Sequence, residues 1–197
     1  QFLLNWLIQN SPEQIVRPAS AMIFAPHPDD ETLGCGGLIA LKRAQGAQVW
    51  VVLLTNGEAS YLYDRTANPA TLPHTRFQEA ERAMAILGVP SSHLVCLNQP
   101  DGQLNTLSEA QRQALVQALS ELIEAHQPEE LYVPHKLDVH SDHEMTYSLV
   151  KQALVRSSYV ATLWQYPVWI FWNRLLFWDL STKDLANAYR VTIREGL

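Results

Sequence analysis

Cysteine is scarce in this sequence, and the lack of paired cysteines argues against two common kinds of site. Cys35 and Cys96 are the only two, and they lie in different segments without the spacing of a disulfide framework or a zinc-binding motif. A disulfide-stapled domain and a cysteine-ligated zinc site are therefore not expected. The sequence instead predicts a protein of a reducing compartment, the cytoplasm.

Positive charge is also in short supply. The chain has 14 Lys and Arg against 20 Asp and Glu, which gives a formal net charge of −6, and it contains no long basic run. Nucleic-acid binding draws on clustered positive charge, so we expect no nucleic-acid partner. A small molecule is the expected partner, and the sequence leaves open whether the chain forms a homo-oligomer.

Long apolar runs are missing as well. No stretch reaches the roughly 18 apolar residues that a membrane-spanning helix needs, so no transmembrane span is expected. Residues 2–8 are apolar, but they lack a basic region and a cleavage site, and we interpret them as a packed helix or arm instead of a signal peptide. Because the first residue is not Met, we expect residues upstream to be missing.

The composition that remains suits one globular α/β domain. With 197 residues, 47% of them hydrophobic, the chain can bury one sizeable core, and residues 1–197 are predicted to form a single domain. Apolar runs predict strands at 21–25, 49–54, 93–97, 131–133 and 189–193. Helical periodicity predicts helices at 32–45, 74–87, 108–126 and from the second acidic cluster to 156, with a short helix after 181. Such strand-helix-strand units predict a Rossmann-like three-layer fold with a mainly parallel sheet.

Chemistry is expected first at the end of the strand at residues 21–25. The run stops at His27, Asp29, Asp30 and Glu31. If the chain turns into a helix there, His27 and Asp30 are three residues apart and meet on one side, where they can converge on a metal ion. The alternative is that the carboxylates only cap the helix and complement its dipole.

A second cluster favours the metal. Asp138, His140, Asp142 and His143 follow the expected strand at 131–133, so acid and imidazole groups stand at two strand ends. Two such clusters are hard to explain as helix caps. We therefore predict one metal site at the carboxyl edge of the sheet.

These motifs together resemble those of the LmbE-like, or PIG-L, family of zinc-dependent N-deacetylases. The resemblance covers about residues 21–150, and Pro26 stands where the family motif has Ala. It rests on the following segments: Pro26-His-Pro-Asp-Asp-Glu31, Gly34-Cys-Gly-Gly37, Thr55-Asn-Gly-Glu58, Arg76-x-x-Glu79, Pro100-Asp-Gly102 and His140-Ser-Asp-His143.

The resemblance implies an active site as well as a fold. One Zn²⁺ per chain, or another divalent ion, would be held by His27, Asp30 and His143. Asp29 would be the general base, and His140, held by Asp142, would face the tetrahedral oxyanion. Arg76 would reach toward a substrate of the N-acetylglucosamine type, which is hydrolysed to acetate and a free amine.

Rival functions remain open from the sequence. A metallo-hydrolase of an ester or phosphoester would need basic residues near the site, for which only Arg65, Arg76 and Lys136 are candidates. A sugar- or nucleotide-binding module without catalysis would have no use for Asp29 beside the metal ligands. The glycines at 34–37 lack the third glycine and the later acidic residue of a dinucleotide site, so we expect them to allow close helix packing instead.

Several other polar and aromatic residues receive no catalytic role. Asp101 is expected to be structural, and the remaining histidines are expected to be bystanders: His74, His93, His126 and His135. The polar stretch up to Pro73 suits either a loop over the site or an ordinary surface loop. Four tryptophans between Trp164 and Trp178 predict a site wall or a subunit contact, with a membrane-surface patch or the core as alternatives.

Overall fold

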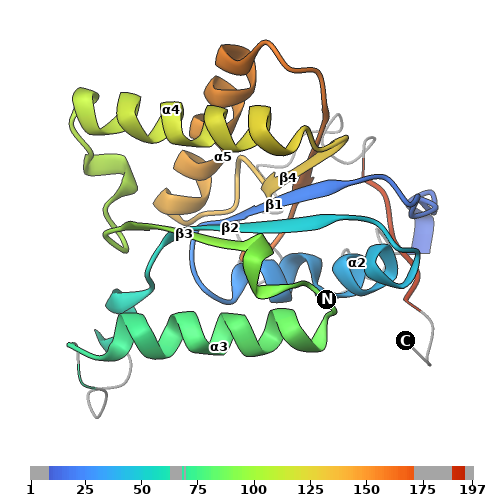
Figure 1. Ribbon diagram of the computed structural model, residues 1–197, viewed down its shortest axis with the longest axis horizontal. Helices are drawn as coiled ribbons and strands as arrows, with labels where there is room; N and C mark the ends of the chain where they lie inside the picture. The colour runs from blue at the N-terminus through green and yellow to red at the C-terminus, as the bar shows by residue number, and fades with distance from the viewer. Residues whose placement is uncertain (1–8, 63–67, 69, 171–187, 194–197) are drawn as a thin grey trace.

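A short, completely buried strand, β1 (Ala21–Ala25), lies at the centre of the fold. The structure is a computed structural model that describes residues 9–62, 68, 70–170 and 188–193. Its five strands form one parallel sheet in the order β3-β2-β1-β4-β5 (Figure 1). The other strands are β2 (Val49–Thr55), β3 (Leu94–Gln99), β4 (Glu130–Pro134) and β5 (Thr162–Tyr166).

Helices cover both faces of this sheet. Figure 1 shows α4 (Glu109–His126) and α5 (Ser141–Ser157) on one face, and α2 (Asp30–Ala44) and α3 (Leu72–Ile86) on the other. Three short 3-10 helices lie between these elements: η1 (Glu58–Leu62), η2 (Ser91–His93) and η3 (Leu104–Thr106). The predicted three-layer α/β fold with a parallel sheet is confirmed.

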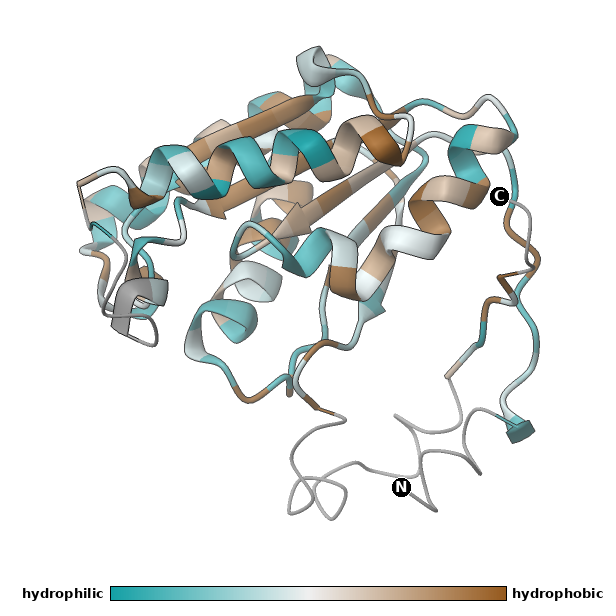
Figure 2. Ribbon diagram, turned by 90° about the horizontal axis from the view of Figure 1, so that it is seen from below, coloured by the Kyte–Doolittle hydropathy of each residue, from teal (hydrophilic) through white to brown (hydrophobic). Residues whose placement is uncertain are grey.

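The alternation of side chains along β1 supplies two cores. Met22 and Phe24 pack in the cluster with α4 and α5, whereas Ile23 packs in the cluster with α2 and α3. Successive residues of a strand point to opposite faces, so a strand covered on both faces is apolar throughout. Figure 2 shows the hydrophobic strands enclosed between helices whose outer faces carry hydrophilic residues.

Helices α2 and α3 begin slightly earlier than predicted. Helix α2 starts at Asp30 instead of residue 32, and Asp30 and Glu31 occupy its first turn, where carboxylates complement the helix dipole. Helix α3 starts at Leu72 instead of residue 74. Pro73 is tolerated there, because the N–H groups of the first helical turn have no partner within the helix and the missing N–H of proline costs nothing.

The strand order determines where a ligand can bind. From β1 the chain proceeds to β2 and β3 on one side of β1, and later to β4 and β5 on the other. The carboxyl ends of β1 and β4 are therefore adjacent at the point where the order reverses, which is the usual ligand position in such sheets. Both sequence clusters follow these two strands.

Two predictions concern the ends of the chain. The expected strand at 189–193 is wrong: within the described residues there, only Arg190 forms an isolated bridge, to Glu13. Ile193 packs instead against Gly37 of α2, so this segment lies on a helix and not at a sheet edge. The helices predicted at 2–8 and after 181 lie outside the described residues. Among the helices that the structure describes, none is long and apolar enough to cross a bilayer.

Candidate metal and catalytic site

His27 and Asp30 converge directly after β1, as the i, i+3 spacing predicts. The Asp30 carboxylate oxygen Oδ2 lies 3.0 Å from His27 Nδ1 and accepts a hydrogen bond of 3.0 Å from the backbone N–H of His27. Asp30 is 2% exposed. The turn into α2 thus aims one carboxylate and one imidazole at the same point.

His143 reaches this point from the first turn of α5. Its Nε2 lies 3.2 Å from Asp30 Oδ2, and its Nδ1 lies 2.7 Å from Asp138 Oδ2, with both His143 and Asp138 fully buried. Asp138 in turn accepts hydrogen bonds from the backbone N–H groups of residues 168–170. Asp138 therefore fixes the tautomer of His143 and directs Nε2 toward Asp30.

The donor set fits a divalent cation. The ligand atoms of His27, Asp30 and His143 all lie within 4.8 Å of one another. Although His143 Nε2 is close to Asp30, it is buried and makes no hydrogen bond. A buried polar atom without a hydrogen bond is costly unless something else binds it. Two imidazoles and one carboxylate are a typical catalytic zinc set, with a position left open.

Asp101, which we expected to be structural, contacts a residue of this site. Its Oδ1 lies 3.0 Å from His27 Nε2, and its Oδ2 accepts a hydrogen bond from the backbone N–H of Ala59. The backbone N–H of Asp101 itself donates to the carboxylate of Glu58. Asp101 thus holds Nε2 of His27 and leaves Nδ1 facing Asp30. In the same way, Asp138 holds Nδ1 of His143 and leaves Nε2 facing Asp30.

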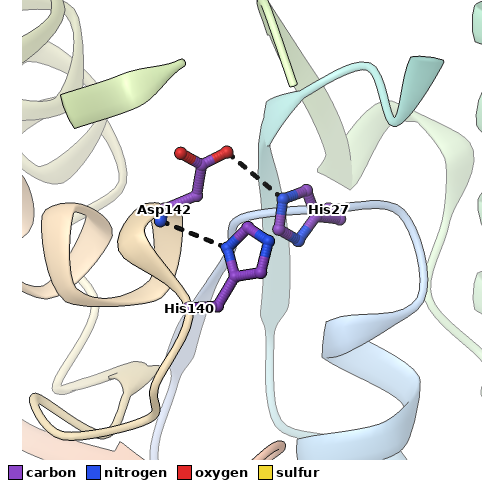
Figure 3. A group of neighbouring side chains, drawn as sticks. All are labelled: His27, His140 and Asp142. Atoms are coloured by element: carbon purple, nitrogen blue, oxygen red, sulfur yellow. Dashed lines mark hydrogen bonds and ion pairs between the residues drawn. The ribbon is translucent and has the colours of Figure 1, made fainter. Parts of the chain in front are cut away.

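His140 and Asp142 are in contact through the backbone of Asp142. The backbone N–H of Asp142 donates to His140 Nδ1 at 3.2 Å, whereas the Asp142 carboxylate points to His27 (Figure 3). That carboxylate also accepts hydrogen bonds from the backbone N–H groups of Gly102 and Leu104. Asp142 therefore contacts His140 through its backbone N–H, because the backbone N–H groups of Gly102 and Leu104 and the ring of His27 occupy its carboxylate oxygens.

A second trio, His27, His140 and Asp142, also has ligand atoms close enough to hold an ion. Its members are already engaged: Asp142 by two backbone N–H groups, and His140 Nδ1 by the backbone of Asp142. The set of His27, Asp30 and His143 suits an ion better, because it includes the buried Nε2 of His143, which makes no hydrogen bond.

The charges of the site are strongly coupled. Burial alone would lower the pKa of His27, but the carboxylates of Asp101, Asp142 and Asp30 outweigh it and raise the pKa to about 12. Burial would raise the pKa of Asp30, yet His143 and His27 hold that pKa well below its usual range. The protein without an ion thus keeps positive charge on imidazole where a cation would otherwise bind.

Burial lowers the pKa of His140, and the nearby His27 and His143 lower it further. His140 is therefore a neutral imidazole at neutral pH. Since its Nδ1 accepts the N–H of Asp142, the ring proton resides on Nε2. His140 can donate one hydrogen bond from Nε2.

Asp29 belongs to the first cluster but does not join the cation site. It occupies the N-cap position of α2, but its side chain makes no capping hydrogen bond. The alternative that this carboxylate only caps the helix therefore does not apply to Asp29. Burial and the neighbouring charge of Asp30 raise the pKa of Asp29, while Arg76 opposes the shift. A carboxylate with a raised pKa beside a cation site is suited to accept a proton.

Arg76 lies in α3 and contacts the same turn. Its Nη2 donates to Asp29 Oδ2 at 2.8 Å and to the backbone carbonyl of Pro28, and its Nη1 donates to Glu79 Oε2 at 2.8 Å. The structure thus brings all the predicted site residues to the carboxyl edge of β1 and β4. Of the predicted aromatic wall, Trp164 and Trp169 are described and Trp169 is half exposed, whereas the last two tryptophans lie outside the described residues.

Comparisons with known proteins agree with this geometry. A sequence profile described as GlcNAc-PI de-N-acetylase, PIG-L, matches residues 22–154. The chain is 31% identical over 140 residues to the probable N-acetyl-alpha-D-glucosaminyl L-malate deacetylase 2 of Bacillus subtilis, covering 68% of this chain and 60% of that protein. The chain thus spans somewhat more than half the length of this curated relative.

Solved structures share the fold. The N,N'-diacetylchitobiose deacetylase of Pyrococcus horikoshii has a TM-score of 0.63 at 23% identity, covering 84% of this chain and 68% of that one. The 4-carboxy-2-hydroxymuconate hydratase GalB of Pseudomonas putida has a TM-score of 0.60 at 23% identity, covering 76% and 63%. A deacetylase and a hydratase thus share one fold, which by itself does not determine the reaction.

Proposed function

Because this chain belongs to the PIG-L family, we propose that it is a metal-dependent hydrolase of the N-acetyl group of an N-acetylglucosamine-type small molecule. The products are acetate and a free amine. The proposal is carried by one observation: two histidines and Asp30 aim their ligand atoms at one point, and each histidine is held from behind by its own carboxylate. The name of the Bacillus relative supports the class of amide.

The cation of this proposal is one Zn²⁺ or other divalent ion per chain, held by His27, Asp30 and His143. When bound, it polarises the amide carbonyl and makes water acidic enough to attack near neutral pH. Asp101 and Asp138 keep the two imidazoles in the tautomers that ligation needs. The negative charge of these carboxylates also favours a cation over a neutral occupant.

The protein supplies the proton transfers and the oxyanion contact. Asp29 accepts the proton of the attacking water and hands it to the departing amine. His140 donates from Nε2 to the oxygen on which negative charge develops, and the backbone of Asp142 holds the ring in that tautomer. Both residues flank the cation site, one from each sequence cluster.

The first test is an activity assay on metal-loaded and chelated protein. We expect release of acetate and a primary amine from at least one member of a panel of N-acetylated glucosaminides, loss of activity on chelation, and recovery with zinc. A panel of esters and phosphoesters serves as the comparison. Turnover of those compounds without amide hydrolysis would refute the proposal.

Two neighbouring carboxylates provide a sharper test. Asp29→Asn keeps the shape of the side chain but removes the proton acceptor, so the variant should retain its metal and lose most of its turnover. Asp30→Asn should weaken metal retention, and excess zinc should restore part of the activity. Metal analysis and rates are measured side by side. Loss of metal in Asp29→Asn with retention in Asp30→Asn would reverse the two roles.

A further inference from the structure

The backbone at Asp29 is strained. Asp29 has φ 151° and ψ −28°, a conformation that residues with a Cβ avoid. Such residues cost about 1–3 kcal/mol and persist only where surrounding contacts enforce them. The strain therefore requires an explanation in the contacts around residues 28 and 29.

Part of the constraint comes from within α2. The backbone N–H of Asp29 donates to Glu31 Oε2 at 3.0 Å, and Glu31 is fully buried. The backbone carbonyl of Asp29 accepts from the N–H groups of Thr32 and Leu33. These bonds fix the peptide at the start of the helix, but they leave the carboxylate of Asp29 unrestrained.

The carboxylate is restrained from outside by Arg76 of α3. One guanidinium nitrogen, Nη2, donates both to the carbonyl of Pro28 and to Asp29 Oδ2, so it links the backbone before the strained residue with the side chain of that residue. The other nitrogen, Nη1, is bound by Glu79 one turn further along the helix. Arg76 thus makes a fixed fork across the strained position.

A third segment closes the packing around this fork. Gly57, in the turn after β2, has φ 71°, and a Cβ at that position would lie 2.9 Å from Pro28 Cδ and 3.6 Å from Arg76 Cγ. The turn therefore needs a glycine for both conformation and space. The turn after β1, the turn after β2 and α3 are packed together around Arg76.

We propose that Arg76 is a positioning residue that acts through Asp29. It holds the strained turn so that the Asp29 carboxylate stays at the place where it accepts the proton, and it contributes to turnover more than to substrate affinity. The sequence-based expectation for Arg76 was contact with the substrate. The inference about catalysis rests on the proposed function, whereas the inference about the conformation of Asp29 does not.

The kinetic test uses Arg76→Ala and Arg76→Lys in two backgrounds. In the native background, Arg76→Ala should lower kcat about 10- to 100-fold with KM changed less than about threefold, as misplacement of a reacting group does. Lysine keeps the charge but not the fork, so Arg76→Lys should recover only part of the loss. In the Asp29→Asn background, Arg76→Ala should have almost no further effect. Arg82→Ala, an exposed arginine of the same helix, is the control.

Two outcomes overturn the inference. A rise in KM with unchanged kcat identifies Arg76 as a substrate contact, and an equal loss in both backgrounds shows that it acts independently of Asp29. A crystal structure of Arg76→Ala adds a readout without activity: residue 29 should leave its strained conformation. If φ of residue 29 stays near 151°, the inference that Arg76 holds the strained turn is wrong even where the kinetics agree. If the native protein lacks amidase activity but residue 29 relaxes in the variant, the proposed function fails and the inference about the turn stands.

Discussion

His27 links the two halves of the site, because its two ring nitrogens face different groups. Nδ1 faces Asp30 of its own turn, and Nε2 faces Asp101 and Asp142, which come from distant segments. When a carboxylate accepts the proton of one ring nitrogen, the lone pair of the other nitrogen is available to a metal ion. The function of His27 therefore depends on the correct assembly of three segments of the chain.

His140 gives the clearest prediction for a single residue outside the cation set. His140→Ala should lower turnover roughly 100- to 1,000-fold, the usual loss when one oxyanion donor is removed. Metal content should stay the same, because His143 and not His140 belongs to the expected ligand set. Rates and metal analysis test this, with His74→Ala, an exposed histidine of α3, as the control. An empty metal site in His140→Ala would mean that His140 and His143 have exchanged roles.

The sequence predicted the metal ligands of the site but not the carboxylates that hold the two histidines from behind. His27 and Asp30 lie three residues apart, so helix geometry alone brings them together. Asp101 was assigned only to a turn. Its contact with His27 was missed because it depends on how β3 and β1 are placed in the sheet, which no local pattern specifies. Asp138 stood in the second cluster, but its contact with His143 was not predicted, because Asp138 precedes α5 and helix geometry does not relate the two residues.

Among the elements, α2 packs unusually close to the sheet. A Cβ at Gly34 would collide with the ring of Tyr166 in β5, and the Tyr166 hydroxyl donates to the carbonyl of Phe24 in β1 at 2.8 Å. The glycine of the helix and the tyrosine of the edge strand thus fit one another. This agrees with the expectation that the glycines at 34–37 serve close packing.

Two neighbouring glycines in α2 allow a matched prediction. Gly34→Ala should lower the free energy of unfolding by about 1–3 kcal/mol, because the added methyl group displaces Tyr166 from a close-packed position. At Gly36 a Cβ meets nothing nearer than 3.7 Å, so Gly36→Ala should be neutral or stabilise by up to about 1 kcal/mol through helix propensity. Urea denaturation of both variants is the measurement. Equal effects at the two positions would contradict this account of the packing.

The core elements were predictable because their apolar runs and helix-ending glycines are strong local signals. The bounds of β1 match the prediction, and the starts of α2 and α3 differ by two residues each. Residues 189–193 failed because apolar, β-forming residues do not by themselves provide a partner strand. In the structure this segment meets Glu13 at one bridge and α2 at Gly37.

At the scale of the whole molecule, one buried ion pair joins helix α2 to strand β4. Lys42 of α2 is 1% exposed and lies 2.6 Å from Glu130 at the start of β4, and it also donates to the carbonyls of Arg17 and Ala19. A fully bonded ammonium is tolerated in a core, but its partner is costly to leave alone. No local pattern signalled this pair, since Lys42 occupies an ordinary helical position. The single domain over residues 1–197 stays a prediction.

The pair predicts part of the response to acid. Burial would raise the pKa of Glu130, but Lys42 and Tyr132 outweigh it and lower that pKa. Because the folded pKa lies below the unfolded one, ionised Glu130 stabilises the fold above about pH 4.5, and this contribution is lost as pH falls through the folded pKa. The free energy of unfolding should therefore depend less on pH below about 4.5 in Lys42→Met/Glu130→Gln than in the native protein.

Urea denaturation across this pH range tests the prediction, with Glu121→Gln, an exposed carboxylate of α4, as the control. At neutral pH, Lys42→Met alone should lower the free energy of unfolding by less than the roughly 3 to 5 kcal/mol of a buried charge left wholly unpaired, because Arg17 and Tyr132 still contact Glu130. An unchanged pH dependence in the double variant would show that other carboxylates dominate acid unfolding.

The reversal of strand order beside β1 has a consequence for the integrity of the molecule. His27 and Asp30 lie in the first sequence cluster, and His143 lies more than a hundred residues later, beyond three strands. An ion bound by all three would act as a cross-link that closes a very long loop, and long loops are those whose closure removes most entropy from the unfolded chain. Removing the ion would then destabilise the contact between the carboxyl ends of β1 and β4, so that a chelator would lower the free energy of unfolding as well as the rate of the reaction.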